Sequence, residues 1–292
     1  MVTDEQGHKT AEAQKVAEAP RKASSGSESS RDRISAVLIV KNEVHKLNAC
    51  LDSLSWADEI VVLDGGSDDG TAELARERGA RVEVRSDWEG FGIQRQRAEA
   101  LAQCHWIFMI DADERVTPTL ERSIRHAVSQ GPAIWEVNRL CWCFGRHIRH
   151  SGMHPDWVPR LYPRGRAEYD QTRVHERLRN PKKLPLRRLD GVLMHHLYDS
   201  VRHQVQKSAH YAEEWALERA SAGRTASLAS AVGHGCFCFV RMYLLRGGFL
   251  DGRPGFLLAL LMSHGTFIKY ADLWVRTRTR TSPSEDAPEY ER

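Results

Sequence analysis

Trp106-Ile107-Phe108-Met109-Ile110-Asp111-Ala112-Asp113-Glu114 is an apolar run that ends abruptly in two carboxylates one residue apart. The apolar part has the composition of a buried strand, and in open α/β sheets ligands bind beyond the carboxyl ends of the strands. Because strand side chains alternate, Asp111 and Asp113 would point to the same side. Carboxylate oxygens at that spacing suit Mg²⁺ or Mn²⁺ holding a diphosphate. The alternative interpretation is a solvated acidic loop.

Strands and helices alternate through the part of the chain that precedes this run. The predicted strands cover 34–40, 59–64 and 81–85, and the predicted helices cover 43–54, 71–78 and 93–103. Such alternation indicates a parallel sheet with right-handed crossovers. We therefore predict an α/β fold with a mostly parallel, Rossmann-like sheet.

Polar loops follow three of the predicted strands. Lys41-Asn42-Glu43 comes after the first strand, Asp64 closes the second, and Asp111 and Asp113 close the fourth. These loops should converge on one rim of the sheet, where an acidic residue ending the second strand commonly accepts hydrogen bonds from a ribose or base. The glycine-rich segment 64–71 matches neither the dinucleotide-binding motif nor the P-loop.

Length and composition allow one large α/β domain with additions, or two modest domains. The chain has 292 residues, of which 41% are apolar and 28% charged, so a substantial core is expected. The formal charge is only +3, but arginines and lysines crowd the stretch 139–188 and would favour a phosphorylated partner. The alternative interpretation of this stretch is a solvated basic face. No recognised nucleic-acid module accompanies the charge, and we expect no nucleic-acid partner. The six cysteines lack zinc-site spacing and are expected to be reduced thiols in the cytosol.

The ordered set of motifs resembles family-2 glycosyltransferases of the GT-A fold. The motifs that carry this resemblance are Val40-Lys41-Asn42-Glu43, Val62-Leu63-Asp64-Gly65-Gly66-Ser67-Asp68-Asp69-Gly70-Thr71 and Asp111-Ala112-Asp113-Glu114. Three further stretches resemble a subgroup that builds the core of bacterial lipopolysaccharide. They are Gly92-Ile93-Gln94-Arg95-Gln96-Arg97, Val174-His175-Glu176 and Gly248-Phe249-Leu250-Asp251-Gly252. The resemblance extends over nearly everything from Ile34 to Tyr270.

The resemblance implies an inverting transferase that moves a hexose, with glucose favoured, from a UDP-sugar to a lipid-anchored, phosphorylated saccharide such as the lipopolysaccharide inner core. Mg²⁺ or Mn²⁺ would be its cofactor. The nucleotide-sugar would be bound by Lys41, Asn42, Glu43, Asp64, Gln94, Arg95, Arg97 and Asp111. Asp113 would bind the cation, with Asp111 nearer the ribose or sharing the metal and His195 as a third ligand. For the helix from Ile93 and for His195, a polar surface and a packing histidine are the alternatives.

An inverting transfer needs one general base for the acceptor hydroxyl. The resemblance points to Glu176 as this base, with Asp156 as its rival, and to Trp157, Arg160 and His175 on the acceptor side. Four alternative functions stay open. A nucleotidyltransferase would need a glycine-rich loop with a lysine after the first strand, which the chain lacks. The others are a non-catalytic sugar-nucleotide-binding module, a transferase acting on another cell-envelope glycan, and a nucleic-acid binder, whose affinity for duplex would fall steeply with salt.

Beyond Tyr198 the chain becomes helical in pattern. Apolar spacing predicts a long amphipathic helix to about Ala222, and two more apolar segments follow. No apolar run reaches the roughly 20 residues that cross a bilayer, so these helices would either lie in a membrane interface or pack back as core. We predict a cytoplasmic protein, peripheral on the inner face of the inner membrane. The predicted divisions are a disordered tail 1–32, a GT-A domain 33–198 (donor half 33–115, acceptor half 116–198), a helical extension 199–280 and a frayed tail 281–292.

Overall fold

Strands β1 to β4 form the parallel half of a nine-stranded mixed sheet. The computed structural model describes residues 32–172 and 176–278. In this half the order is β3-β2-β1-β4, and β1 pairs in parallel with both β2 and β4. The elements are β1 (Ile34–Val40), α1 (Val44–Asp52), β2 (Glu59–Asp64), α2 (Thr71–Glu77), β3 (Arg81–Val84), α3 (Phe91–Leu101) and β4 (Trp106–Met109).

The second half of the sheet mixes directions and continues in the order β8-β6-β11-β5. Strand β8 is antiparallel to β4 and β6, β11 runs parallel to β6, and β5 closes antiparallel on β11. A short strand, β7, pairs with β6, and β9 and β10 form a separate ladder. The elements are β5 (Glu114–Val116), α4 (Pro118–Val128), β6 (Ile134–Cys143), β7 (Arg146–Ile148), β8 (Asp156–Pro163), β9 (Glu168–Tyr169), β10 (Leu178–Arg179) and β11 (Leu186–Tyr198).

Both faces of the sheet are buried. On one face Leu38 and Phe108 pack in a cluster that extends to Leu120 of α4, while Val37 and Ile107 belong to a second cluster on the other face. Neighbouring residues of one strand thus enter different cores, which is why the central strands read as continuous apolar runs rather than alternating ones.

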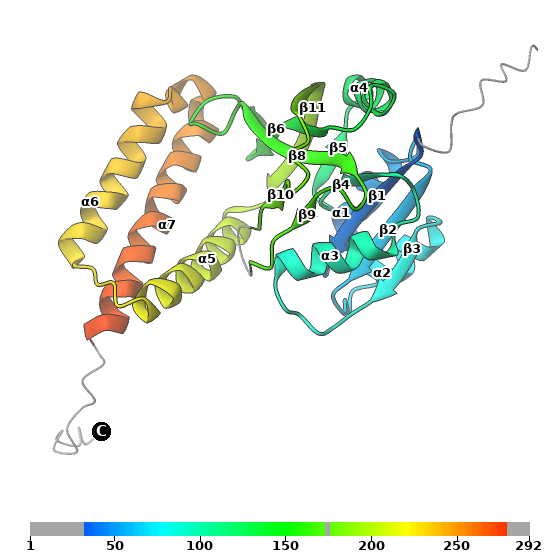
Figure 1. Cartoon of the computed structure of the whole chain (residues 1–292). Coiled ribbons are helices and arrows are strands. Elements are labelled where there is room, and N and C mark those ends of the chain that lie inside the picture. The colour runs from blue at the N-terminus through cyan, green and yellow to red at the C-terminus, as the bar shows by residue number, and fades with distance from the viewer. Residues whose placement is uncertain (1–31, 173–175, 279–292) are drawn as a thin grey trace, which may run out of the picture.

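Three helices follow the sheet and stand on one flank of it (Figure 1). In this view α6 and α7 run side by side, and α5 passes from the sheet toward their far end. A third apolar cluster joins α6 and α7 to Cys143 and Ile148 of the sheet. The elements are α5 (Val201–Ser221), α6 (Leu228–Phe239), a π-helical turn (Val240–Leu245), a 3₁₀ turn (Gly248–Asp251) and α7 (Gly252–Arg278).

One helical stretch, Leu228–Leu245, is long and apolar enough to cross a membrane by length and composition alone, and 22% of it is buried. This corrects the expectation that no such stretch exists. The sequence pattern breaks the stretch into shorter apolar runs, whereas the π-helical turn continues α6 without interruption for six more residues.

The α/β prediction is confirmed, with C-terminal helices after the sheet. The strands at 34–40 and 59–64 and the long helix after Tyr198 lie where the pattern predicted them, and other ends shift by one or two residues. The predicted tails 1–32 and 281–292 fall outside the described residues except for Asp32. The boundaries inside 33–280 stay predictions.

Candidate active site

The turn Asp111–Glu114 leaves the end of β4 and enters β5. Glu114 is fully buried and shapes the turn, because its Oε2 accepts a hydrogen bond from the Asp111 amide at 3.0 Å and its own amide donates to the Asp111 carbonyl at 2.9 Å. The Ile110 amide continues the ladder to Val37 at 3.0 Å. The two aspartates of the motif are therefore fixed at the carboxyl end of the central strands, as the sequence predicted.

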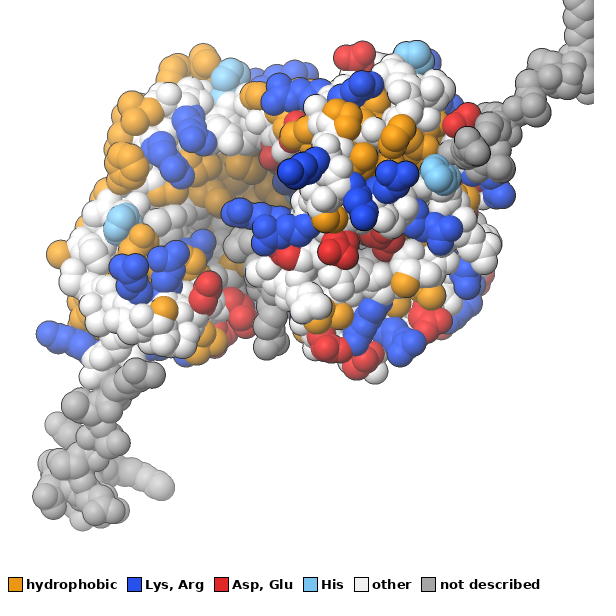
Figure 2. Space-filling view, viewed as in Figure 1, with side chains coloured by type: hydrophobic (Ala, Val, Ile, Leu, Met, Phe, Trp, Pro, Cys, Tyr) orange, Lys and Arg blue, Asp and Glu red, His pale blue; other side chains and the backbone are white. Residues whose placement is uncertain are grey.

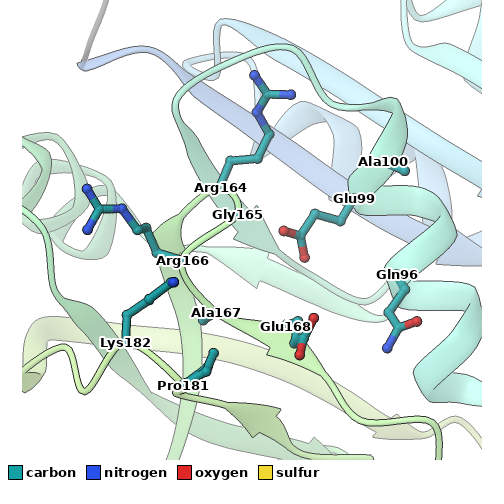
Figure 3. Close-up of a pocket in the computed structure, with 10 residues that line it drawn as sticks. All are labelled: Gln96, Glu99, Ala100, Arg164, Gly165, Arg166, Ala167, Glu168, Pro181 and Lys182. Atoms are coloured by element: carbon teal, nitrogen blue, oxygen red, sulfur yellow. The ribbon is translucent and has the colours of Figure 1, made fainter.

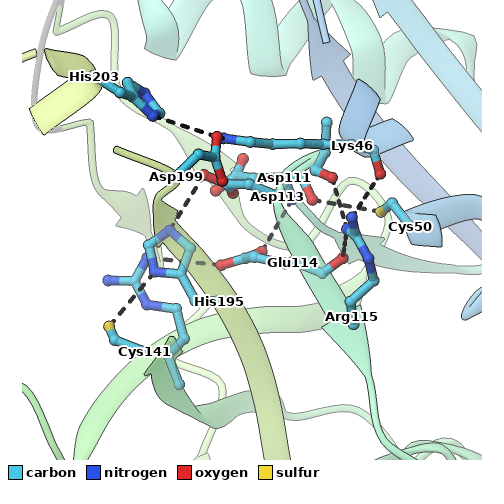
Figure 4. A network of polar contacts seen from close by, with 12 residues as sticks. Lys46, Cys50, Asp111, Asp113, Glu114, Arg115, Cys141, His195, Asp199 and His203 are labelled. Atoms are coloured by element: carbon cyan, nitrogen blue, oxygen red, sulfur yellow. Dashed lines mark hydrogen bonds and ion pairs between the residues drawn. The ribbon is translucent and has the colours of Figure 1, made fainter. Parts of the chain in front are cut away.

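Asp113 lies against His195 of β11. The Nε2 atom of His195 is 3.4 Å from Asp113 Oδ2, and the His195 Nδ1 atom is 3.8 Å from Cys141 Sγ (Figure 4). The contact exists because His195 is paired with Glu114 across the β5–β11 ladder, and the His196 amide donates to the Asp113 carbonyl at 2.8 Å. Residues 82 positions apart in the chain thus form one polar pair.

The charges of this pair support each other. Burial alone would lower the pKa of His195, but the hydrogen bond and the negative charge of Asp113 raise it to about 10. For Asp113, burial raises the pKa, and the bond and charge of His195 outweigh it, so that the carboxyl pKa is lowered. In the absence of other ligands, both shifts favour the charged forms of the two groups.

Asp111 is held between two buried arginines. Arg95 Nη2 donates to Asp111 Oδ1 at 2.8 Å, and Arg160 Nη2 donates to Oδ2 at 2.6 Å. Burial raises the pKa of Asp111, yet the two guanidinium groups hold it well below its usual range. Both carboxylate oxygens are engaged, so Asp111 is less available to a cation than Asp113.

These contacts belong to one continuous chain of ion pairs. Arg95 Nε also donates to Glu176 Oε1 at 2.8 Å, and Arg160 Nη2 donates to Glu114 at 2.7 Å. From Glu114 the chain passes to Arg139, 3.7 Å away, which binds Asp156 at 2.7 Å. In order, the chain is Glu176, Arg95, Asp111, Arg160, Glu114, Arg139 and Asp156. The two candidate bases stand at its opposite ends.

Two local features of the backbone set the positions of Arg95 and Arg160. A Cβ at Gly92 would overlap the Asp170 carbonyl oxygen, so only glycine lets α3 approach the segment that leads to Glu176. Arg160 is the extra residue of a β-bulge between β8 and β6. Pro159 pairs with Glu136 and Leu161 pairs with the adjacent Trp135, so Arg160 lies between the two pairs. Bulges turn a side chain away from its regular direction and are frequent beside active sites.

The loops after β1 and β2 are tied to each other. Asn42 accepts a hydrogen bond from the Asp68 amide at 3.0 Å, and its own amide donates to Ser67 Oγ at 2.8 Å. Asp64 is buried and accepts three hydrogen bonds from its own loop, from the Gly66 amide at 2.8 Å and from Ser67 at 2.7 and 2.6 Å. Asp64 thus shapes this loop, and its contact with a nucleotide stays a prediction.

Two residues predicted to bind the nucleotide-sugar, Arg97 and Gln94, contact other parts of the protein. The guanidinium of Arg97 pairs with Asp87 and Glu89, because two residues along a helix turn it about 200° away from Arg95. Gln94 is buried and donates to the Asp87 carbonyl at 3.3 Å. Both side chains thus contact the loop before α3, and their contact with the phosphates stays a prediction.

The residues predicted for the acceptor side have different surroundings. Arg160 is buried in the ion-pair chain beneath the motif rather than presented to an acceptor. Trp157 is partly exposed and carries the Arg188 guanidinium 4.5 Å from its ring centroid. Lys41 is exposed. Burial raises the pKa of Glu43, and the negative charge of Asp113 raises it further. His175 lies outside the described residues.

Helix α5 adds residues that the motifs did not reveal. Asp199, just before it, binds Lys46 of α1 at 2.9 Å and His203 at 3.4 Å (Figure 4). The charge of Lys207 lowers the pKa of Asp113, and besides burial the charges of Glu176, Asp111 and Asp113 raise the pKa of Tyr211. Positions 203, 207 and 211 share one helix face. The four-residue spacing of positions 203, 207 and 211 was the sequence signal that could have identified these residues.

The donor set fits a divalent cation only in part. Within residues 32–172 and 176–278, no group of three or more His, Cys, Asp or Glu side chains is placed to hold a metal ion. Asp113 and His195 supply two donors. Mg²⁺ and related cations bind through one or two carboxylates and complete their shell with substrate phosphates and water. The residues therefore fit a cation that arrives with a diphosphate, and not an all-protein cage.

A cavity of about 470 Å³ lies elsewhere, between α3 and the turns that follow β8 and β10 (Figure 3). It is lined by Glu99, Arg164, Arg166, Glu168 and Lys182, among others. No residue predicted for the active site lines it.

A comparison with protein-family models places residues 35–182, about half of the chain, in the family described as glycosyl transferase family 2. Among curated proteins, the lipopolysaccharide core biosynthesis glycosyltransferase LpsC of Rhizobium meliloti is 28% identical over 262 residues, which cover 87% of this chain and 96% of that protein. An uncharacterized glycosyltransferase of Rickettsia prowazekii is 24% identical over 253 residues, covering 82% of this chain and 86% of that one.

Solved structures match a shorter part. Glucosyl-3-phosphoglycerate synthase from Mycobacterium tuberculosis, in complex with Mn²⁺, UDP and glucosyl-3-phosphoglycerate, is 28% identical with a TM-score of 0.33. That match covers 38% of this chain and 44% of the solved one. Mannosyl-3-phosphoglycerate synthase from Rubrobacter xylanophilus is 27% identical with a TM-score of 0.32, covering 37% and 40%. The chain thus spans less than half the length of these solved proteins.

Proposed function

The chain belongs to glycosyl transferase family 2, and from this premise we propose that it is an inverting, metal-dependent enzyme that transfers a hexose from a UDP-sugar to a lipid-anchored, phosphorylated saccharide. The observation that carries the proposal is Arg95, whose guanidinium binds both Asp111 of the donor motif and Glu176. One side chain therefore holds the candidate general base next to the candidate donor site.

On the donor side, Asp113 of the motif and His195 of β11 would hold the cation, because neither side chain is enclosed by arginines. When bound, the cation would neutralise charge on the leaving diphosphate. The protein adds its own positive charge, since Lys207 acts electrostatically on Asp113 and Lys46 is anchored nearby through Asp199. Asp111 would act through the arginines, fixing the turn and keeping Arg95 oriented.

Glu176 is the better candidate for the general base. Its Oε1 accepts a charge-assisted hydrogen bond from Arg95 Nε at 2.8 Å, which fixes the carboxylate in place. Glu176 Oε2 would take the proton of the acceptor hydroxyl as the oxygen attacks the anomeric carbon. Asp156 is bound by Arg139 through two nitrogens, at 2.8 and 2.7 Å, and lies at the far end of the chain of ion pairs. We therefore assign Asp156 a supporting role.

The acceptor assignment rests on relatedness and charge. The relative from Rhizobium meliloti is named for lipopolysaccharide core biosynthesis and matches over most of both chains. The basic stretch 139–188 would meet the phosphates of such an acceptor, and Trp157 with Arg188 offers a flat surface for a sugar ring. Glucose is the proposed donor sugar, and Mg²⁺ or Mn²⁺ the proposed cofactor.

The test is UDP release from a panel of UDP-sugars, with lipopolysaccharide inner-core acceptor, in Mg²⁺, Mn²⁺ or EDTA. We expect release that needs metal and acceptor. Glu176→Gln should lower kcat about 10²- to 10⁴-fold while UDP affinity is retained. Asp156→Asn is the matched control and should retain more activity than Glu176→Gln. Equal losses in the two variants would exclude the assignment of Glu176, and UDP binding without turnover on any acceptor would favour a sugar-nucleotide-binding module.

A further inference from the structure

Helix α6 is apolar on two opposite sides. Its inner side, formed by Ala231, Gly235, Cys238 and Met242, is buried in the hairpin that α6 makes with α7. A surface helix of a soluble protein presents polar residues on the other side. Here the outer side carries large apolar residues instead, and the turn to α7 continues them. We call this set the α6 apolar face, consisting of Val232, Phe237, Val240, Leu244, Phe249 and Leu250.

The exposure of this face is high for side chains of this size. Phe237 is 56% exposed and Leu250 is 55% exposed, although each belongs to a well-defined element. Figure 2 shows orange side chains gathered over the α6–α7 hairpin. Contiguous exposed apolar surface on a soluble domain marks a site of protein or membrane interaction.

Positive charges outnumber negative ones in the α6–α7 hairpin. Residues 228–278 contain six lysines and arginines but only two acidic residues. Of these two, Asp251 is buried, and Asp272 is paired with Arg276 at 2.9 Å. Arg241 and Arg253 are exposed beside the apolar residues. An apolar strip flanked by unopposed arginines is complementary to an anionic lipid surface, where acyl chains lie beneath negative headgroups.

The tip of the hairpin is firmly attached to the catalytic part. The buried carboxylate of Asp251 accepts hydrogen bonds from the Arg149 amide at 3.1 Å and the His150 amide at 2.9 Å, and His150 Nδ1 is 3.0 Å away. A Cβ at Gly248 would crowd Ser151 Oγ and the Met242 carbonyl oxygen, both within 2.7 Å. The Gly-Phe-Leu-Asp-Gly motif thus anchors the tip through its aspartate and glycines, and leaves Phe249 and Leu250 outside.

We propose that the α6 apolar face docks on an anionic lipid bilayer, with α6 lying in the membrane interface rather than crossing it. The helix is fixed on its inner side by α7 and at its tip by Asp251, so only the outer side is free to enter lipid. The attachment orients the β7–β8 turn, and with it the start of β8, toward the membrane surface. The inference goes beyond the transfer reaction and does not depend on which acceptor is used.

Vesicle flotation with the full-length protein tests this. Wild type should float with phosphatidylcholine–phosphatidylglycerol vesicles and much less with phosphatidylcholine alone. Replacing Phe237, Leu244 and Phe249 together by Ser should weaken binding at least about 100-fold, since each side chain removes a large buried apolar area. Arg241→Gln with Arg253→Gln should weaken binding to the anionic vesicles about 30-fold. Leu186→Ser is the control, because Leu186 is 60% exposed but lies on β11.

Three outcomes would contradict docking of this face on lipid, and one further measurement separates an interfacial from a spanning helix. Failure of wild type to float with anionic vesicles, or equal flotation of the triple serine variant shown to be folded by circular dichroism, would overturn it. A dimer in light scattering that the triple variant converts to monomers, without lipid binding, would identify the face as a contact between two copies. Release by alkaline carbonate supports the interfacial position, whereas retention would show that α6 spans. Flotation is independent of turnover, so this result and the UDP-release test fail separately.

Discussion

The two aspartates of the Asp-x-Asp turn have different surroundings although one residue separates them. Asp111 is enclosed by Arg95 and Arg160, whereas Asp113 meets a single imidazole. Removing one partner of a buried ion pair leaves an uncompensated charge, which is far more costly than never having had the pair. The same chemical change should therefore have different consequences at the two positions.

We expect Asp111→Asn to lower the free energy of unfolding by about 3–5 kcal/mol, because two buried guanidinium groups lose their shared carboxylate. Asp113→Asn should cost much less, since His195 can release its proton and stay neutral. It should nevertheless abolish metal-dependent UDP binding. Urea denaturation and calorimetric titration of UDP with Mn²⁺ measure the two effects. Similar stability losses in both variants would contradict the distinction.

Arg95 is expected to be a positioning residue for the general base. Lysine keeps the charge but cannot bind Asp111 and Glu176 with two differently directed nitrogens. Losing one charge-assisted hydrogen bond is worth about 1.5–3 kcal/mol, so Arg95→Lys should lower kcat about 10- to 100-fold. UDP affinity should change little. Arg97→Lys, on the other face of α3, is the control. An unchanged kcat in Arg95→Lys would remove this role.

At the scale of elements, close approach of backbones decides how the site is assembled. The first turn of α3 touches the segment 170–172, and the Gly92 amide donates to the Thr172 carbonyl at 3.2 Å. This contact brings Arg95 to the chain segment that carries Glu176. The subgroup motif that begins with Gly92 is thus explained by space as much as by its polar residues.

Gly92→Ala should destabilise the protein by about 1–3 kcal/mol through overpacking and should also lower kcat. The physical reason is that the new methyl group must displace either α3 or the Asp170 backbone. Gly233→Ala is the control, because Gly233 lies in helix α6 with nothing near its Cβ position and should be neutral or slightly stabilising. Thermal unfolding and steady-state kinetics give the comparison. A fully active, equally stable Gly92→Ala would show that the contact is not required.

At the scale of the whole molecule, the candidate active site is shared among distant parts of the fold. Its residues come from α1, the β4–β5 turn, α3, β11 and the face of α5. The folded chain alone brings these parts together, so a ligand of the site binds the native state and stabilises it by mass action. Global stability therefore reports occupancy of the site.

UDP and Mn²⁺ should raise Tm together and much less when added singly, because the two protein donors leave most of the cation shell to the diphosphate. At a concentration about 100 times Kd, the stabilisation should be about 2.7 kcal/mol. Scanning calorimetry with UDP, Mn²⁺, both, or both with EDTA measures it. His195→Ala should diminish the joint shift. A joint shift equal to that of UDP alone would exclude a bridging cation.

Local sequence patterns were enough to predict the α/β class, the strands at 34–40 and 59–64, and the position of Asp111 and Asp113 at the end of β4. These follow from local patterns, since apolar period and turn residues are set within about ten positions. The resemblance of the motifs also anticipated the family. The antiparallel pairings in the second half of the sheet depend on distant partners and leave no local signature.

Which polar residues meet depends on how distant elements pack in three dimensions. His195 reaches Asp113 through the β5–β11 ladder, Arg160 is turned inward by a bulge, and Arg97 faces away from its neighbour Arg95. The unbroken course of α6 and its exposed apolar face likewise emerge only once α7 has taken the inner side. Side-chain direction and burial depend on what packs against each element, and that information is spread over the whole chain.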